Sequence, residues 1–289
     1  MKKLFLLTAT ILCCFCSCKN EKLAIAGSGW NDIAIINKKT GNIEWKHTLA
    51  PGEECNDIEV TPEGNILYAY AKGAKLINRD HETIWDYKAG ENELIHTATR
   101  LPDGGFMVAV CGEPARIVEL DNSGNKKSEF EFNTFIFNIP NQFRQVTVTK
   151  DGEYLVPLIE KQTVLRFTKT GERRKLIFVG HDVFSVNELD NNNLLVSCGR
   201  SSLFIEIDPE QQQIENKIIT NEIRGGVLRY VAEIVLYKNG NKLIANSNLY
   251  NTDRSQPLLI EIDKDDKVVW SLPYNKAISN ITAVYSFFE

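Results

Sequence analysis

The sequence lacks the features that would place it in several common classes of protein. It has no GxSxG, HExxH or P-loop motif, and so no sign of an α/β-hydrolase, a zincin metalloprotease or a P-loop nucleotide-binding enzyme. No segment keeps a sustained apolar period near 3.6 residues, which an αβ repeat would need in every unit. The net charge is −5 at pH 7, with no basic excess, so we expect no nucleic-acid partner.

Cysteine is scarce outside the N-terminal segment. Four of the seven cysteines lie in the first 18 residues, which leaves Cys55, Cys111 and Cys198 in the body. These three are odd in number and far apart, and they form no CxxC or Cys/His cluster, so neither a disulfide framework nor a zinc site is indicated, although one bridge stays open. We expect all three to be buried as small apolar side chains.

The N-terminus has the features of a bacterial export signal. Two lysines precede the apolar stretch "LFLLTATIL", which is too short to span a bilayer as a stable helix. The run that ends at Ser17-Cys18 resembles the bacterial lipobox, in which the signal peptidase cuts before a cysteine that is then acylated. Acylation of Cys16 and an ordinary cleaved secretory signal are the alternatives.

The lipobox resemblance implies how the chain is divided and where it resides. Residues 1–17 would be a lipoprotein signal peptide, Cys18 the site of lipidation, 18–22 a lipid-anchored linker and 23–289 a single domain. The mature protein would then lie in the cell envelope. There it would be attached through its lipid to the outer membrane, either facing the periplasm or exposed at the surface.

The body of the chain repeats one hairpin pattern. Alternating residues precede a turn that accepts positive φ, and an apolar strand follows, which is the signature of a β-hairpin. The matching segments are 57–70, 97–110, 145–158, 185–198 and 233–246. Their turn centres are Gly64, Gly104, Gly152, Asn192 and Gly240, spaced 40, 48, 40 and 48 residues apart.

A second hairpin follows each of these, so every unit contains four strands. Four strands in about 40–48 residues is the spacing of a β-propeller blade. The unit that begins at residue 23 lacks its innermost strand, and 279–289 has the pattern of that missing strand. We therefore predict an all-β fold, a six-bladed β-propeller with four-stranded antiparallel blades, closed by N- and C-terminal strands that share one blade. A seventh blade would require further strands within 219–257.

The repeats resemble known propeller families. The text "LPDGGFMV…RIVELDNSG" is similar to the repeats of bacterial quinoprotein-like and NHL-like propellers, a likeness that implies the fold and not the activity. Quinoprotein dehydrogenases use an adjacent cysteine pair, which the mature body lacks, so we expect no quinone cofactor. The segments "CNDIEVTPEGN", "IHTATRLPDGG" and "HDVFSVNELDNNN" resemble arylsulfotransferase-like blades, which carry His-Asp before a similar turn, but this sequence contains no intact His-His-Asp.

Aligned repeats predict which side chains approach the central channel. Eight residues before each turn centre stand Asn56, His96, Arg144, Phe184 and Ala232, with Asn280 in the closing strand. One residue later stand Asp57, Thr97, Gln145, Ser185 and Glu233. Because the starts of the inner strands surround one mouth of a propeller channel, we expect the site at that mouth.

Four of these residues form the candidate catalytic group. The pKa of histidine lies near neutrality, so His96 suits proton transfer, with Asp57 or Glu233 to orient it or to share a metal. Arg144 suits bidentate binding of a carboxylate, sulfate or phosphate. The alternative is that these polar groups only hydrogen-bond each other and ordered water.

The remaining candidates would bind ligand. They are Asn56, Gln145 and Asn280 in the channel, Arg116 and Arg200 in the mouth loops, and Trp30 in the glycine-rich "GSGWND". No blade is evident for Trp30 to pack into, and an aromatic ring beside cationic donors suits a sugar acid or another anionic ligand.

Two kinds of function follow. The first is a propeller that binds an anionic or carbohydrate ligand, or a partner protein, at its channel mouth without catalysis. The second is an enzyme of the lactonase, polysaccharide lyase or sulfotransferase type, acting on a sugar acid or sulfated substrate with His96 as acid or base. We expect no cofactor and no metal site, with a divalent ion such as calcium in the channel as the alternative.

Overall fold

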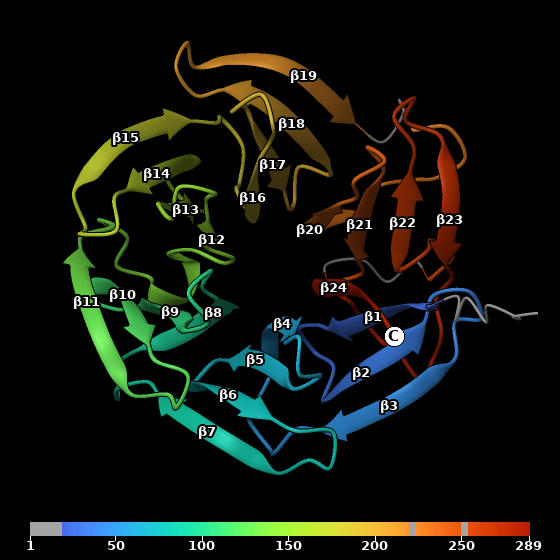
Figure 1. Cartoon of the computed structure of the whole chain (residues 1–289). Coiled ribbons are helices and arrows are strands. Elements are labelled where there is room, and N and C mark those ends of the chain that lie inside the picture. Colours follow the sequence, from blue (N-terminus) through green and yellow to red (C-terminus); the bar gives the residue numbers. More distant parts are fainter. Residues whose placement is uncertain (1–18, 220–222, 250–253) are drawn as a thin grey trace, which may run out of the picture.

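A computed structural model of the protein describes residues 19–219, 223–249 and 254–289, and these form a ring of six four-stranded antiparallel sheets (Figure 1). The predicted six-bladed β-propeller is confirmed. The predicted signal peptide and Cys18 lie outside the described residues. Within the described parts of the chain, no helix has the length and hydropathy of a membrane span.

The first three blades each contain four strands, ordered from the channel outward. Blade 1 consists of β24 (Ala283–Phe288), β1 (Glu21–Ala26), β2 (Asp32–Asn37) and β3 (Ile43–Thr48). Blade 2 consists of β4 (Cys55–Val60), β5 (Ile66–Tyr70), β6 (Gly73–Ile77) and β7 (Thr83–Lys88). Blade 3 consists of β8 (Leu94–Arg100), β9 (Phe106–Cys111), β10 (Ala115–Leu120) and β11 (Lys126–Phe132).

The second half of the ring repeats this order. Blade 4 consists of β12 (Thr147–Val148), β13 (Tyr154–Leu158), β14 (Thr163–Phe167) and β15 (Arg173–Phe178). Blade 5 consists of β16 (Ser185–Glu188), β17 (Leu194–Cys198), β18 (Leu203–Asp208) and β19 (Gln213–Ile219). Blade 6 consists of β20 (Tyr230–Leu236), β21 (Lys242–Ser247), β22 (Leu259–Ile262) and β23 (Val268–Leu272).

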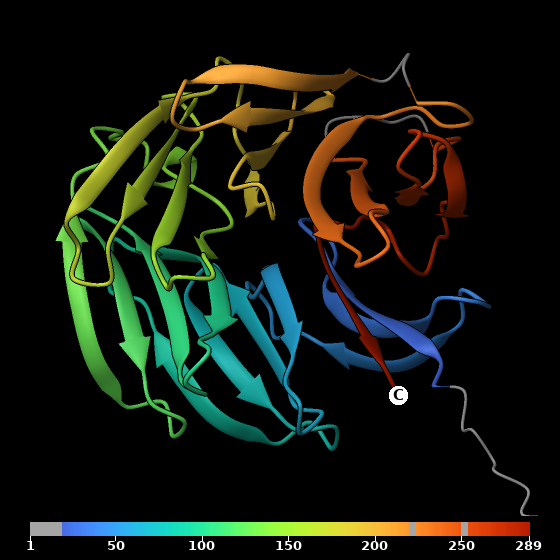
Figure 2. The same cartoon turned by 45° about the horizontal axis from the view of Figure 1, so that its top comes forward.

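Both ends of the described chain meet in blade 1. The last strand, β24, pairs with β1 from Glu21 opposite Phe288 to Ala26 opposite Ala283, and the N–H of Asn20 donates to the carbonyl of Glu289 at 2.8 Å. Figure 2 shows the red β24 lying beside the blue β1. The predicted closure is therefore confirmed, and it leaves no open edge in the ring at this point.

The blades stack through buried apolar faces. Between blades 3 and 4, for example, Ile117 and Phe132 pack in one cluster with Tyr154 and Phe167. The strands β5 and β9 are buried along their whole length, which explains why they are apolar runs rather than alternating ones. The three body cysteines are free and buried, as the sequence predicts.

Aromatic side chains on the outer strands lock neighbouring blades together. The indole N–H of Trp45 donates to the carbonyl of Arg79 in a turn of blade 2 at 2.9 Å. In the same way, Phe130 of blade 3 covers the turn at Gly171 in blade 4. A Cβ at Gly171 would lie 2.6 Å from the Phe130 side chain, and φ there is +82°. The turn therefore needs glycine for both its backbone and its packing.

Gly171→Ala should destabilise the protein more than Gly240→Ala. Both glycines have positive φ, +82° and +87°, but an added Cβ at Gly240 meets nothing within 4 Å. Left-handed alanine costs about 1 kcal/mol at either site, and overpacking against Phe130 adds about 1–3 kcal/mol at Gly171 alone. The measurement is the free energy of unfolding in denaturant. Equal losses in the two variants would contradict the role of the aromatic contact.

Candidate functional site

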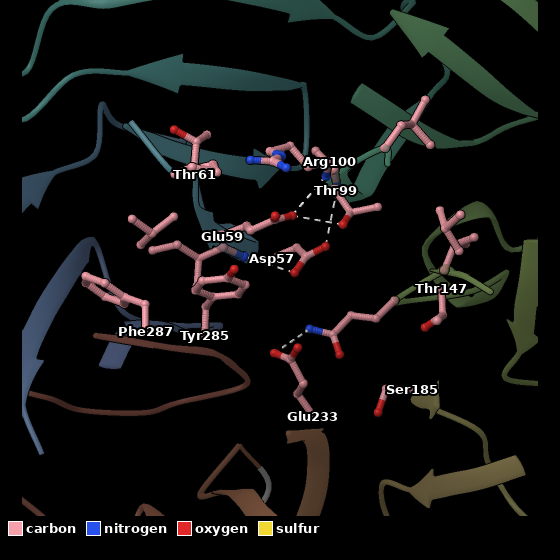
Figure 3. Close-up of a pocket in the computed structure, with 18 of the residues that line it drawn as sticks. Asp57, Glu59, Thr61, Thr99, Arg100, Thr147, Ser185, Glu233, Tyr285 and Phe287 are labelled. Atoms are coloured by element: carbon pink, nitrogen blue, oxygen red, sulfur yellow. Dashed lines mark hydrogen bonds between the residues drawn. The ribbon is translucent and has the colours of Figure 1, made fainter. Parts of the chain in front are cut away.

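A cavity of about 610 Å³ opens at the end of the channel where the inner strands finish. Its walls carry the turns at Thr61–Gly64 and Leu101–Pro102, which join inner strands to second strands. The aligned repeats predict the site at the other mouth, where the inner strands begin. The cavity extends from Asp57 and Ser185, near the starts of their inner strands, to the opposite ends of these strands (Figure 3).

One of the two aligned positions supplies four polar residues of the cavity lining. Of the residues seven positions before each turn centre, Asp57, Gln145, Ser185 and Glu233 line the cavity. The fifth, Thr97, is buried, and its hydroxyl donates to the carbonyl of Arg144 at 2.7 Å. The alignment of the repeats therefore places the correct position in the channel.

In blades 2 and 3 the other aligned position is occupied by a bulge residue. The pairing of β4 with β5 skips Asn56, and the pairing of β8 with β9 skips His96. A bulge residue has no partner in the ladder and leaves the alternation of side chains. Neither Asn56 nor His96 contributes to the cavity lining.

The inner strands are linked to one another by side chains rather than by a shared ladder. Each inner strand pairs with one neighbour only, the second strand of its own blade. Its free backbone edge is bonded by side chains of the preceding blade. The links are Asp57 to the N–H of Ala98, Thr97 to the N–H of Val146, Ser185 to the carbonyl of Ala232, Asn187 to the carbonyl of Ile234, and Glu233 to the N–H of Val284.

Three carboxyl groups make links of this kind, of which Asp57 is buried and Glu59 and Glu233 are half-buried. Asp57 accepts from the N–H of Ile58 at 3.0 Å and of Ala98 at 3.3 Å. Glu59 accepts from the Thr99 hydroxyl and the Arg100 N–H, each at 2.9 Å (Figure 3). These bonds hold both carboxylates against the next blade.

Glu233 crosses the channel to a distant blade. Its Oε2 accepts from the N–H of Val284 at 2.7 Å and from Nε2 of Gln145 at 3.0 Å. Blade 6 is thereby joined to blade 1 at the channel wall and to blade 4 across the channel.

Burial raises the pKa of all three carboxyl groups. Burial, with the neighbouring charge of Glu233 and then Glu59, raises the pKa of Asp57 well above its usual value. Burial raises the pKa of Glu233 to about 7 and also raises that of Glu59. At neutral pH the channel therefore holds carboxyl groups that keep protons more strongly than exposed ones do.

His96 and Arg144 lie away from the cavity. His96 is 6% exposed, and among the described residues neither ring nitrogen has a hydrogen-bond partner. Burial, followed by the charge of Arg144, lowers its pKa well below 6.5. The guanidinium of Arg144 donates to the carbonyls of Pro140 and Phe143 in its own loop. The structure thus does not bring either residue to Asp57 or Glu233.

The remaining predicted ligand-binding residues have structural contacts. Trp30 is 6% exposed and packs between blades 1 and 6, so it does have a core to enter, contrary to the expectation. The amide of Asn280 donates to Ser28 and accepts from Ser247 and Asn248. Arg116 pairs with Glu93, Asn56 donates to the carbonyl of Glu54, and the backbone N–H of Arg200 donates to Asp182.

Several lining residues are absent from the set that the sequence predicts. They are Glu59, Thr99, Thr147, Asn187, Tyr285 and Phe287. Each of the first four stands two residues after an aligned channel position, so the two-residue period of a strand carries the missing signal. The two aromatic residues follow the same period along β24.

Oxygen atoms dominate the chemistry that the cavity offers. Carboxylate and amide oxygens are ligands for hard cations. Across residues 19–219, 223–249 and 254–289, however, no three His, Cys, Asp or Glu side chains gather closely enough to hold a metal ion. What the described side chains provide is a set of carboxyl, amide and hydroxyl groups together with two aromatic rings.

Comparison with known proteins places the chain among propellers. Residues 29–256 match the model of the family described as Mal s 1 allergenic protein-like. A protein of unknown function from Bacteroides caccae is 37% identical, with a TM-score of 0.88 over 92% of this chain and 98% of that one. No curated protein sequence matches.

More distant structures share the fold alone. Virginiamycin B lyase from Staphylococcus aureus is 13% identical, with a TM-score of 0.62 over 89% of this chain and 83% of that chain. The WD40 propeller domain of Doa1 is 13% identical, with a TM-score of 0.58 over 77% and 71%. From the match over 29–256 and the Bacteroides relative, we conclude that this chain belongs to the Mal s 1 allergenic protein-like family.

Proposed function

We propose that the protein is an exported, lipid-anchored propeller that binds a carbohydrate-type ligand in the channel cavity without catalysis. The observation that carries this proposal is the lining of the cavity. The carboxyl group of Asp57, the amide of Gln145 and the hydroxyl of Ser185 line the same cavity as the rings of Tyr285 and Phe287. Figure 3 shows Asp57, Ser185 and Tyr285 around this space. Sugars are bound by such a combination, in which polar groups bond the hydroxyls and an aromatic ring packs on the apolar ring face.

The charge of the lining argues against an anionic ligand. The ionisable groups around the cavity are the carboxylates of Asp57, Glu59, Glu233 and Glu289 and the guanidinium of Arg100. Each of these carboxyl groups repels a sugar acid or sulfated ligand when it is ionised, and Arg100 alone among the five would attract it. A neutral or cationic polyhydroxy ligand fits this lining better than the anionic ligand that the sequence suggests.

The position of the N-terminus supports a membrane-side cavity. Asn20 is hydrogen-bonded to Glu289, which lines the mouth of the cavity. Cys18 precedes Asn20 by two residues, so a lipid on Cys18 would emerge within about 7 Å of chain from this mouth. An anchored protein would then present the cavity, or a partner protein seated on its rim, close to the outer membrane.

A second candidate is a propeller enzyme that uses carboxyl groups. It is favoured by the raised pKa values of Glu233, about 7, and of Asp57 beside it, since a carboxyl group that titrates near neutrality suits acid–base catalysis. His96 would have no part in it, because it does not line the cavity. Turnover of a bound sugar that is lost in Glu233→Gln would favour the enzyme over the binder.

Phe287→Ala should weaken carbohydrate binding. The probes are cello-, malto-, manno- and chito-oligosaccharides of four units, with affinity measured by isothermal titration calorimetry. Loss of a stacking ring should reduce affinity about tenfold. The matched control is Phe178→Ala, which removes a ring that is 58% exposed on β15, away from the cavity. Equal affinity in both variants, or no binding of any probe to the parent protein, would contradict the proposal.

Glu233→Gln should stabilise the protein at pH 8 and not at pH 4. The folded state raises the pKa of Glu233 from 4.5 to about 7, so it holds the proton more strongly than the unfolded chain does. This preference for the proton contributes on the order of 3 kcal/mol to the free energy of unfolding below pH 4.5. The contribution is lost as the pH rises to about 7. Glutamine stays neutral throughout and can accept the same two hydrogen bonds. Thermal unfolding at both pH values tests this, and an equal shift at the two would refute it.

A further inference from the structure

Hydrogen-bond acceptors predominate in the part of the cavity lined by Asp57, Gln145 and Glu233. We call this part of the cavity the neck. The amide N–H₂ of Gln145 is committed to Glu233, and the two carboxyl groups already accept backbone N–H groups of their own and neighbouring strands. The atoms of the neck that can still bond a ligand are therefore chiefly acceptor oxygens.

One of these oxygens lacks any partner among the described residues. Gln145 is 5% exposed, and its buried Oε1 receives no hydrogen bond. A buried acceptor without a donor costs about 1–3 kcal/mol, so such an atom in the wall of a cavity indicates that a donor belongs there.

The charged groups that act most strongly on the neck are all negative. The charges that act most strongly on Asp57 are those of Glu233 and Glu59, and the strongest on Glu233 is that of Glu59, all of the same sign. The guanidinium of Arg100 lies on the Thr61 and Thr99 side of the cavity (Figure 3), and it acts on Glu59. Arg100 would therefore not compete with a positively charged ligand group for Asp57 and Glu233.

We propose that the neck binds a primary ammonium group, and that the ligand of this propeller is an amine-bearing sugar. The proposal rests on the proposed carbohydrate function and specifies its ligand. An ammonium group has three donors and no acceptor, which matches Gln145 Oε1 and the carboxylates of Asp57 and Glu233. The sugar ring would lie toward Tyr285 and Phe287.

Proton linkage gives the ammonium site a characteristic pH dependence. Because Glu233 titrates near pH 7 in the free protein, a bound cation favours its ionised form and displaces the proton. Affinity for 1,4-diaminobutane, whose amines stay protonated throughout this range, should therefore rise between pH 6 and pH 7, whereas affinity for the N-acetylated sugar should stay constant.

The test compares two oligosaccharides that differ only at nitrogen. The tetramer of glucosamine carries ammonium groups, and the tetramer of N-acetylglucosamine carries neutral amides. Their affinities are measured by calorimetry at pH 6.5 for the parent protein, Asp57→Asn and Glu233→Gln. The control is Glu131→Gln, which removes the same charge from an exposed position on β11. A diamine without a sugar, 1,4-diaminobutane, is tested in parallel by thermal shift.

We expect the glucosamine tetramer to bind at least tenfold more tightly, with the preference abolished in both neck variants and kept in Glu131→Gln. Equal binding of the two tetramers, weakened by Phe287→Ala, would overturn the ammonium site and leave the carbohydrate function intact. Stabilisation by 1,4-diaminobutane alone, lost in both neck variants, would support the ammonium site while contradicting the carbohydrate function. An equal loss in Glu131→Gln would mean non-specific charge attraction and overturn the proposal. The proposal would also be overturned if calcium chloride stabilised the protein and the amines did not.

Discussion

The structure depends on how the inner strands satisfy their free backbone edges. Every inner strand pairs with the second strand of its own blade and with no strand of the next, because adjacent blades diverge around the ring. A buried N–H or carbonyl group without a partner would cost free energy at every blade. Side chains such as Asp57, Thr97 and Ser185 remove that cost by bonding the backbone of the following blade. The same contacts hold the blades in register and shape the wall of the channel.

This arrangement explains why fold and candidate site overlap so closely. The residues that link one inner strand to the next must point along the channel, and any ligand in the channel meets them. Glu233 illustrates both roles, since it bonds Val284 of the closing strand, reaches Gln145 across the channel and also lines the cavity. The site therefore needs no separate framework, because the contacts that close the ring also orient its polar groups.

The sequence carries most of the fold and about half of the candidate site. The hairpin turns, the blade number and the pairing of 279–289 with the first strand follow from local patterns that repeat around the ring. Asp57, Gln145 and Glu233 follow from the alignment of those repeats. His96 and Asn56 do not reach the cavity because a bulge displaces them, and no residue type marks such a bulge. Trp30 packs between blade 1 and blade 6, and the blade 6 residues lie about 200 residues further along the chain, which no local pattern reveals.

The residue type at each link between inner strands distinguishes a purely structural role from a role in ligand binding. Thr97 and Ser185 join inner strands through hydroxyl groups without introducing charge. Asp57, Glu59 and Glu233 make equivalent links with carboxyl groups, and burial raises their pKa, so ionising them near neutral pH lowers the stability of the fold. Since hydroxyl groups serve the ring equally well in blades 3 and 5, the fold alone does not call for acids in blades 2 and 6. A cationic donor in the channel would give Asp57 and Glu233 a partner of opposite charge, which Arg100 supplies only to Glu59.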